Sequence, residues 1–259
     1  MMDKQNIIFK YLGQSGIFCK SGSFSFMIDP YLSNSVEELE AKDLKRKIPI
    51  PFKPNEINNL DWIFVTHEHI DHCDPHTLPI LEKNNKNLKI VGPEKVRKKL
   101  LEWGIPQNKI IKASKKRLKL AEDIFMHSIP AAHPTLTYAF DGEPNEIGWI
   151  LEIKRKKILF TGDTSLTEEI ISSLKEYLPI ELGFLPVNED NFFRRRRGII
   201  GNMSIREAFG LADELNIKTV FPVHWDLFDV NSTLIDEIKA VYRGYKWKFA
   251  LTFSCEEVI

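Results

Sequence analysis

Apolar and polar positions along the chain follow two periods, which predict both strands and helices. Short apolar runs bounded by Gly, Ser and charged residues predict strands. These runs cover residues 7–13, 16–22, 24–29, 60–66, 124–133, 147–153, 157–163 and 218–224. Helical signals occur at residues 92–104, 165–178 and 204–215. The early half is strand-rich and the later half alternates strands with helices, so the pattern indicates an α/β fold.

Local signals at the ends of the predicted helices place their boundaries. Pro93 suits a first helical position, and Gly104 suits the position after a last turn. Ser165 and Ser204 are each followed three residues later by Glu, which is the spacing of a capping box. The charged, Pro-containing stretch of residues 36–60 predicts an exposed loop with a helical turn.

Composition narrows the class of protein. The 259 residues carry 36 Lys and Arg against 36 Asp and Glu, so the formal net charge is zero. A neutral chain argues against a general binder of nucleic acid or of membrane surfaces. The three cysteines, Cys19, Cys73 and Cys255, are far apart and predict reduced thiols. With no signal peptide, membrane span or linker evident in the sequence, we expect a cytoplasmic protein with one domain over residues 1–259.

Residues 64–74, FVTHEHIDHCD, place four candidate metal ligands directly after a predicted strand. They are His67, His69, Asp71 and His72. Neutral imidazole suits zinc and similar transition metals, and a carboxylate adds charge to the site. Four such side chains in six positions could divide between two neighbouring ions. The alternative is a polar turn that caps the next helix, and the ligand density argues against it.

Three further segments place a candidate ligand just past an apolar run. They are IPAAHPT with His133, ILFTGDT with Asp163, and VFPVHWD with His224. Strand ends are where residues distant in sequence meet at one edge of a sheet. A site of His and Asp leaves coordination positions open for water, which is the catalytic arrangement of zinc sites.

This ordered set resembles the metallo-β-lactamase superfamily, with T-H-x-H-x-D-H, a later His, G-D-T and a final strand-end His. The resemblance implies an αββα sandwich with a site for two divalent ions. It implies that His67, His69 and His133 hold the first ion and that Asp71, His72 and His224 hold the second, with Asp163 bridging both.

A finer resemblance is to the ascorbate-6-phosphate lactonase-like branch. It is carried by residues 11–32, by the turn at residues 66–74 and by RGIIGNMSIREAFGLADELNIKTVFPVHWDLF at residues 197–228. The lactonase has a carboxylate at the place of His133. A histidine there favours Zn²⁺, with Mn²⁺ as the second expectation.

The ligand set predicts hydrolysis. A metal ion lowers the pKa of a bound water to about 7, which makes hydroxide available at neutral pH. With two ions, one presents hydroxide while the other polarises the substrate, and we assign Asp71 and His72 to this catalytic step. The expected substrate is a small lactone or ester, phosphorylated if the lactonase resemblance extends to it. The alternative is a phosphodiesterase or nuclease of the same fold. A redox relative using iron is disfavoured, because that branch has Glu at the position of His69.

Two other features bear on the site. Arg197 matches the R-G-I of the lactonase branch and is predicted to bind an anionic group of the substrate. Arg194 to Arg196 are expected to form a solvated basic loop. Asp29 either orients a ligand imidazole or merely starts a turn before Pro30, and both readings stay open. The expected partner is a small molecule, and a homo-oligomer is left open.

Overall fold

The structure is a computed structural model that describes residues 7–254. Within this range the chain divides into two compact units. The N-terminal unit comprises residues 7–113 with Ser254, and the C-terminal unit comprises residues 114–253. Each unit is described by itself, and the single domain over residues 1–259 stays a prediction. Cys255 lies outside the described residues.

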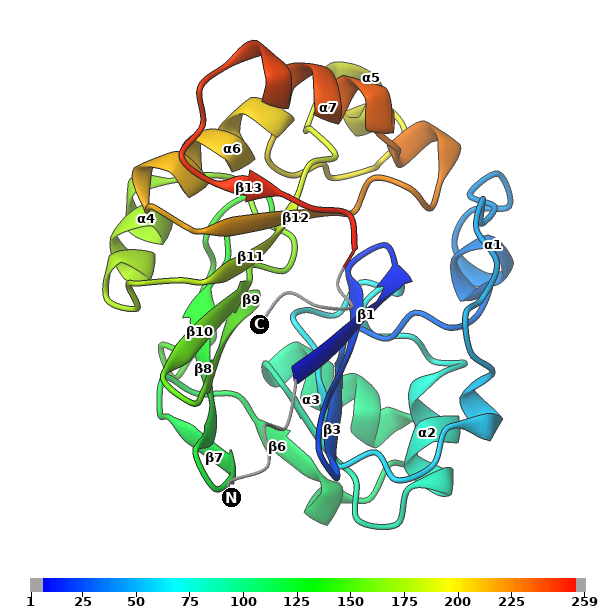
Figure 1. Cartoon of the computed structure of the whole chain (residues 1–259). Coiled ribbons are helices and arrows are strands. Elements are labelled where there is room, and N and C mark those ends of the chain that lie inside the picture. Colours follow the sequence, from blue (N-terminus) through cyan, green and yellow to red (C-terminus); the bar gives the residue numbers. More distant parts are fainter. Residues whose placement is uncertain (1–6, 255–259) are drawn as a thin grey trace. The chain divides into compact units, whose positions relative to one another are not determined.

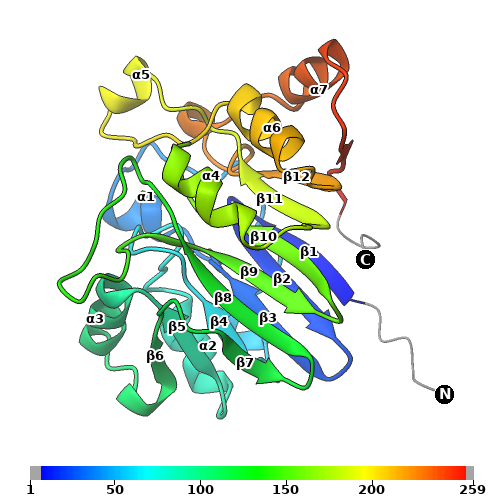
Figure 2. The same cartoon turned by 90° about the vertical axis from the view of Figure 1, so that its left-hand side faces the viewer.

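The N-terminal unit, whose β1, β3 and β6 are labelled in Figure 1 and all of whose strands are labelled in Figure 2, contains a six-stranded sheet in the order β1-β2-β3-β4-β5-β6. The first three strands are antiparallel neighbours: β1 (Ile7–Gly13), β2 (Gly16–Ser21) and β3 (Phe24–Ile28). The next strands join in parallel: β4 (Trp62–Phe64), β5 (Lys89–Gly92) and β6 (Ile110–Lys112). The helices are α1 (Ser35–Leu39), α2 (Leu78–Asn84) and α3 (Glu94–Glu102), with 3₁₀ turns at Pro54–Glu56 and Gln107–Lys109.

Helices α2 and α3 pack against this sheet through a single apolar cluster. Ile63 and Ile90 from the sheet lie in it with Leu81 and Leu100 from the helices, all fully buried. Burial of one such side chain stabilises the fold by about 1.5–3 kcal/mol. Gly92 lets α3 approach, because a Cβ atom there would lie 2.7 Å from a methyl group of Val96.

The C-terminal unit contains a seven-stranded sheet in the order β13-β12-β11-β10-β9-β8-β7. Its antiparallel part is β7 (Leu118–Ala121), β8 (Ile124–Pro130), β9 (Ile147–Ile153) and β10 (Lys156–Phe160). Its parallel part continues from β10 with β11 (Leu182–Pro186), β12 (Thr219–Val223) and β13 (Ala250–Leu251). Strands β8, β10, β11 and β12 therefore run in the same direction, and their carboxyl ends lie at one edge of the sheet.

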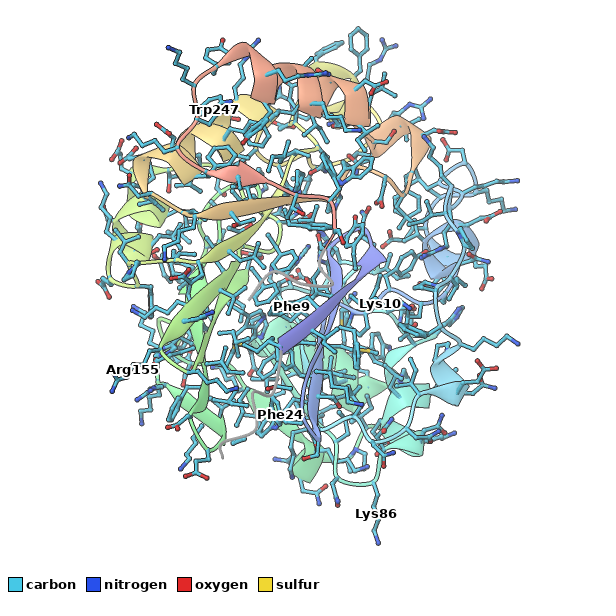
Figure 3. The ribbon with its side chains drawn as sticks, viewed as in Figure 1. Phe9, Lys10, Phe24, Lys86, Arg155 and Trp247 are labelled. Atoms are coloured by element: carbon cyan, nitrogen blue, oxygen red, sulfur yellow. The ribbon has the colours of Figure 1, made fainter. Side chains whose placement is uncertain are left out.

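The helices of the C-terminal unit are α4 (Glu168–Lys175), α5 (Phe192–Arg195), α6 (Ile205–Glu214) and α7 (Ile235–Gly244), with a 3₁₀ turn at Asp229–Asn231. Leu174 of α4 and Phe209 of α6 are buried in one cluster with the sheet residues Ile150 and Leu159. Trp247 packs edge-on against Phe209, with ring centroids 5.7 Å apart (Figure 3). No helix among the described residues has the length and apolar character needed to cross a bilayer.

The observed helix boundaries correct one predicted cap and confirm another. Ser204 and Glu207 form both hydrogen bonds of the predicted capping box on α6. The box predicted at Ser165 is wrong, because Thr167 caps α4 and its side chain accepts from the Ile170 amide. The Gly104 signal is confirmed, since this residue follows α3 with φ of +78°, a conformation that favours glycine. The predicted exposed loop of residues 36–60 contains the expected helical turn at Pro54–Glu56, but its first residues belong to α1, where Val36 is buried.

Candidate metal centre

The four ligand candidates of the N-terminal unit lie in a turn that follows β4, which we call the histidine turn (residues 66–74). The Val65 amide continues the sheet by donating to the Val91 carbonyl at 2.8 Å. The turn is then closed by the His72 and Cys73 amides, which both donate to the His69 carbonyl, at 3.0 and 2.7 Å. This short coil brings four side chains that lie within six positions of the sequence to one side of the sheet edge.

The imidazoles of the histidine turn are within reach of one another. His67 Nε2 lies 3.0 Å from His69 Nδ1, and the ring centroids of His67 and His72 are 4.2 Å apart. Two nitrogens that each bind a tetrahedral zinc ion at about 2.0–2.1 Å lie roughly 3.3–3.4 Å from each other. The spacing of His67 and His69 therefore fits a pair of ligands to one ion.

Asp29, directly after β3, organises the histidine turn. Its carboxylate accepts hydrogen bonds from the Thr66 amide at 2.8 Å and from the Thr66 hydroxyl at 2.7 Å. The same carboxylate lies 2.8 Å from His72 Nδ1. A carboxylate only accepts, so a neutral His72 carries its proton on Nδ1 and keeps Nε2 available as a metal ligand. This contact favours the reading of Asp29 as the residue that orients the His72 imidazole over that of a mere turn start, and the metal role of His72 stays a prediction.

Gln14 holds Asp71 in a similar way, and sequence analysis did not identify it. Its side-chain Nε2 donates to Asp71 Oδ2 at 2.6 Å, and its own carbonyl accepts from the Tyr11 hydroxyl at 2.9 Å. Gln14 is buried at the turn between β1 and β2 with φ of +58°. Asp29 also has positive φ, at +43°. Such backbone conformations cost non-glycine residues about 1–3 kcal/mol and gather at functional sites.

Three ligand candidates of the C-terminal unit meet at the edge where the carboxyl ends of β8, β10 and β12 lie. His224 Nε2 is 3.0 Å from Asp163 Oδ2, and His133 Nε2 is 3.7 Å from the same oxygen. All three side chains are buried. One carboxylate oxygen that approaches two imidazoles has the arrangement expected of a ligand shared between two ions.

The backbone around these three residues is tied together. The Ala132 amide donates to the Thr164 hydroxyl at 3.0 Å, and the Ser165 amide donates to the Ala132 carbonyl at 2.7 Å. These bonds join the segment of His133 to the segment of Asp163. Gly162 precedes Asp163 with φ of +62°, a conformation that favours glycine in the turn after β10.

The histidine turn also contains a cysteine, which sequence analysis did not assign as a ligand. Cys73 is fully buried, and burial raises the pKa of its thiol. Near the turn, partial desolvation and then the negative charge of Asp71 raise the pKa of Glu40, although this residue is exposed by its accessible surface.

The arginine run differs from its prediction at one position. Arg194 was expected to be solvated but is buried, and its guanidinium donates to the carbonyls of Glu189, Val230 and Ser232 at 2.5, 3.3 and 2.8 Å. A guanidinium has five donors in a fixed fork, so it can satisfy several loop carbonyls at once. Arg197 is exposed in the turn after α5, where its amide donates to the Arg194 carbonyl at 2.9 Å.

The sequence therefore placed His67, His69, Asp71 and His72 together correctly, and likewise His133, Asp163 and His224. That the two groups form one centre stays a prediction. So do the metal roles of the individual residues, the catalytic roles of Asp71 and His72, and the substrate role of Arg197.

Comparison with known proteins gives a consistent picture. The family described as "Beta-lactamase superfamily domain" matches residues 25–225. A UPF0173 metal-dependent hydrolase from Pyrobaculum islandicum is 25% identical over 220 residues, which cover 85% of this chain and 84% of that protein. Igni18, a metallo hydrolase from Ignicoccus hospitalis, has a similar structure with a TM-score of 0.66 at 20% identity. The match covers 98% of this chain and 97% of the other.

One relative corresponds to the finer resemblance. A probable L-ascorbate-6-phosphate lactonase from Salmonella heidelberg is 22% identical over 223 residues. The match covers 81% of this chain but only 61% of the lactonase. This chain therefore spans less than two thirds of the length of that relative.

Proposed function

Because the chain belongs to the β-lactamase superfamily domain family and is a metal-dependent hydrolase of the metallo-β-lactamase fold, we propose that its seven His and Asp ligands hold two divalent ions. In this proposal His67, His69 and His133 bind one ion, Asp71, His72 and His224 bind the other, and Asp163 contacts both. The observation that carries the proposal is the single oxygen of Asp163 that approaches both His133 and His224.

The donor set supports zinc as the first choice of metal. Five of the seven proposed ligands are imidazoles, which suit zinc, while the two carboxylates leave manganese as the second choice. Bound ions of this kind lower the pKa of a water ligand to about 7 and so supply hydroxide at neutral pH.

The protein's own side chains fix the orientation of this site. Asp29 keeps the proton of His72 on Nδ1, and Gln14 holds one oxygen of the Asp71 carboxylate at 2.6 Å. Asp71 would then be in place to orient a nucleophilic water and to pass its proton towards a leaving group, and His72, with both ring nitrogens occupied, would serve catalysis by holding the ion. Removing a residue that orients a metal ligand typically lowers metal affinity or activity by about 10- to 100-fold.

The proposed substrate is a small lactone or ester, with a phosphate or other anionic group at Arg197. Support for it comes from the match to the probable ascorbate-6-phosphate lactonase and from the exposed position of Arg197. A guanidinium can bind a phosphate through two parallel hydrogen bonds. The second candidate, a phosphodiesterase or nuclease, uses the same ligands, and a substrate screen separates the two.

The test begins with elemental analysis of purified protein and a screen of lactones, esters, phosphodiesters and RNA. Asp163→Ala should abolish hydrolysis, and the isosteric Asp163→Asn should lower it strongly, while circular dichroism stays unchanged. His76→Ala is the matched control, because His76 pairs with Glu38 outside the proposed ligand set and should keep full activity. Full activity in chelator-treated protein or in Asp163→Ala protein would rule out the proposed role of the ions.

A further inference from the structure

The loop between β11 and α6 carries large apolar side chains on its surface. Phe192 and Phe193 open α5 and are 62% and 73% exposed. Their rings lie edge to face, 5.5 Å apart between centroids. Arg195 and Arg196 follow them and are also exposed. We call these four residues the aromatic–basic tip.

Hydrogen bonds of Arg194 and Asn191 fix the backbone from which the tip projects. Arg194 lies between the two pairs in sequence and points inward, where its guanidinium binds the three loop carbonyls described above. Asn191 caps α5, because its side-chain oxygen accepts from the Phe193 and Arg194 amides, each at 3.1 Å. With Arg194 buried, its neighbours on the other side of this short turn face solvent.

The stem of the same loop is closed by buried amides. Asn202 Nδ2 donates to Asn188 Oδ1 at 2.9 Å, and Asn188 Nδ2 donates to Asn231 Oδ1 at 3.1 Å. Gly201 permits this closure, because a Cβ atom there would lie 2.3 Å from the Cα atom of Asp190. The buried side chains of Arg194, Asn188, Asn202 and Asn231 thus hold this loop in place. The phenyl rings of the tip are exposed and contribute little to the core.

A second loop at the same edge of this sheet also ends in an exposed ring. The segment after β8 forms a hairpin in which the Ala139 amide donates to the Glu143 carbonyl at 2.8 Å. Phe140 at its end is fully exposed. Figure 2 shows this loop and α5 beyond the same ends of the strands. Exposed phenyl groups therefore occur on two loops at one edge of the C-terminal unit.

We propose that the aromatic–basic tip docks the C-terminal unit onto an anionic phospholipid surface. Phenyl rings on a protruding turn can enter the boundary between headgroups and acyl chains, and arginines beside them attract anionic lipids. Arg195 Nη1 forms an ion pair with Asp190 Oδ2 at 3.0 Å, which partly neutralises its charge. Arg196 is therefore the main cation of the tip that can attract anionic lipids. The contact is therefore weak and reversible. The neutral net charge excludes a general attraction to membranes but not this local one.

Two other occupants fit the tip less well. RNA binding would require more cations, because affinity for a polyanion grows with the number of phosphate contacts. A second copy of the chain would need roughly 800 Å² of matching surface per partner, which two phenyl rings do not supply. Both remain distinguishable outcomes of the experiment below.

The test is sedimentation of the full chain with vesicles of phosphatidylcholine alone, or of equal parts phosphatidylcholine and phosphatidylglycerol. The wild type should bind the mixed vesicles and not the neutral ones. Phe192→Ser/Phe193→Ser should lower the bound fraction by about tenfold at low salt, and high salt should release the wild type from the mixed vesicles. Arg196→Ser should lower it at low salt only, because screening already removes the attraction at high salt.

The matched control is Lys154→Ser/Arg155→Ser, in the turn between β9 and β10 at the opposite edge of the same sheet (Figure 3). This pair removes two exposed cations and should leave vesicle binding unchanged. Equal losses in both double variants, or no binding by the wild type, would overturn the proposal. Retention of single-stranded RNA without vesicle binding, or dimerisation abolished by Phe192→Ser/Phe193→Ser, would reassign the tip. Repeating the measurement with chelator present keeps its outcome independent of the proposed metal centre.

Discussion

Single residues beside the proposed ligands decide how those ligands are oriented. Asp29 could be suspected from sequence, because it ends the predicted strand of residues 24–29, directly before Pro30. Gln14 could not, because a Gln between two glycines in LGQSG looks like an ordinary hairpin turn. Only the pairing of β1 with β2 shows that this turn reaches Asp71, 57 positions further along the chain.

Substituting Gln14 should weaken metal binding. Gln14→Asn keeps an amide that tolerates positive φ but is too short to reach Asp71. Gln14→Glu keeps the length and places a second negative charge beside the carboxylate. Both variants should bind Zn²⁺ about 10- to 100-fold more weakly, measured by competition with a chromophoric chelator at neutral pH.

Ser15→Ala is the control in the same turn, because Ser15 contacts no proposed ligand through any hydrogen bond of the described residues. It should bind zinc as the wild type does. Unchanged affinity in both Gln14 variants would show that the hydrogen bond at 2.6 Å has no part in positioning Asp71.

At the scale of elements, the four arginines of residues 194–197 lie in different environments. Four consecutive arginines look uniform in sequence, but α5 turns one of them inward and three of them outward. Burial lowers the pKa of Arg194, and its three carbonyl partners compensate for the loss of water. The sequence holds no signal for this choice, because the loop of residues 229–232 that receives the guanidinium is distant in the chain.

Arg194→Met should therefore destabilise the fold, and Arg197→Met should not. The first change leaves three loop carbonyls without a donor and should cost roughly 2–4 kcal/mol in the free energy of unfolding, measured by urea denaturation. Arg197→Met should leave stability unchanged and raise KM for an anionic substrate, with Arg197→Lys intermediate.

Arg196→Met serves as the exposed control for both measurements. If Arg196→Met and Arg197→Met raise KM equally, the increase comes from general electrostatics and not from a specific contact. Loss of the increase at high salt would support the same conclusion. An Arg194→Met protein as stable as the wild type would show that the buried guanidinium does not hold the loop.

At the scale of the whole molecule, most of the fold was predictable from apolar runs and strand ends. The family, the α/β metallo-β-lactamase fold and the class of metal-dependent hydrolase are confirmed. Strands at 89–92, 110–112, 118–121, 182–186 and 250–251 were not predicted. Most are short, and the strand at 182–186 contains Gly and Pro, which argue against strands when read without their neighbours.

The ligand candidates were predictable for a different reason. Each follows an apolar run, and in the C-terminal unit β8, β10 and β12 share a direction that brings His133, Asp163 and His224 to one edge. The residues that orient the ligands were harder to predict from the sequence. Hydrogen bonds such as that of Gln14 to Asp71 depend on tertiary packing and leave no local sequence pattern.

The central claim is that two ions are bound by ligands drawn from both units, and anomalous diffraction at the zinc absorption edge from zinc-loaded crystals tests it most directly. The account predicts two peaks, with ligand nitrogens at about 2.0–2.1 Å from each. His67, His69 and His133 should surround one peak, Asp71, His72 and His224 the other, and Asp163 should contact both. A single peak, or peaks whose ligands all come from one unit, would contradict it.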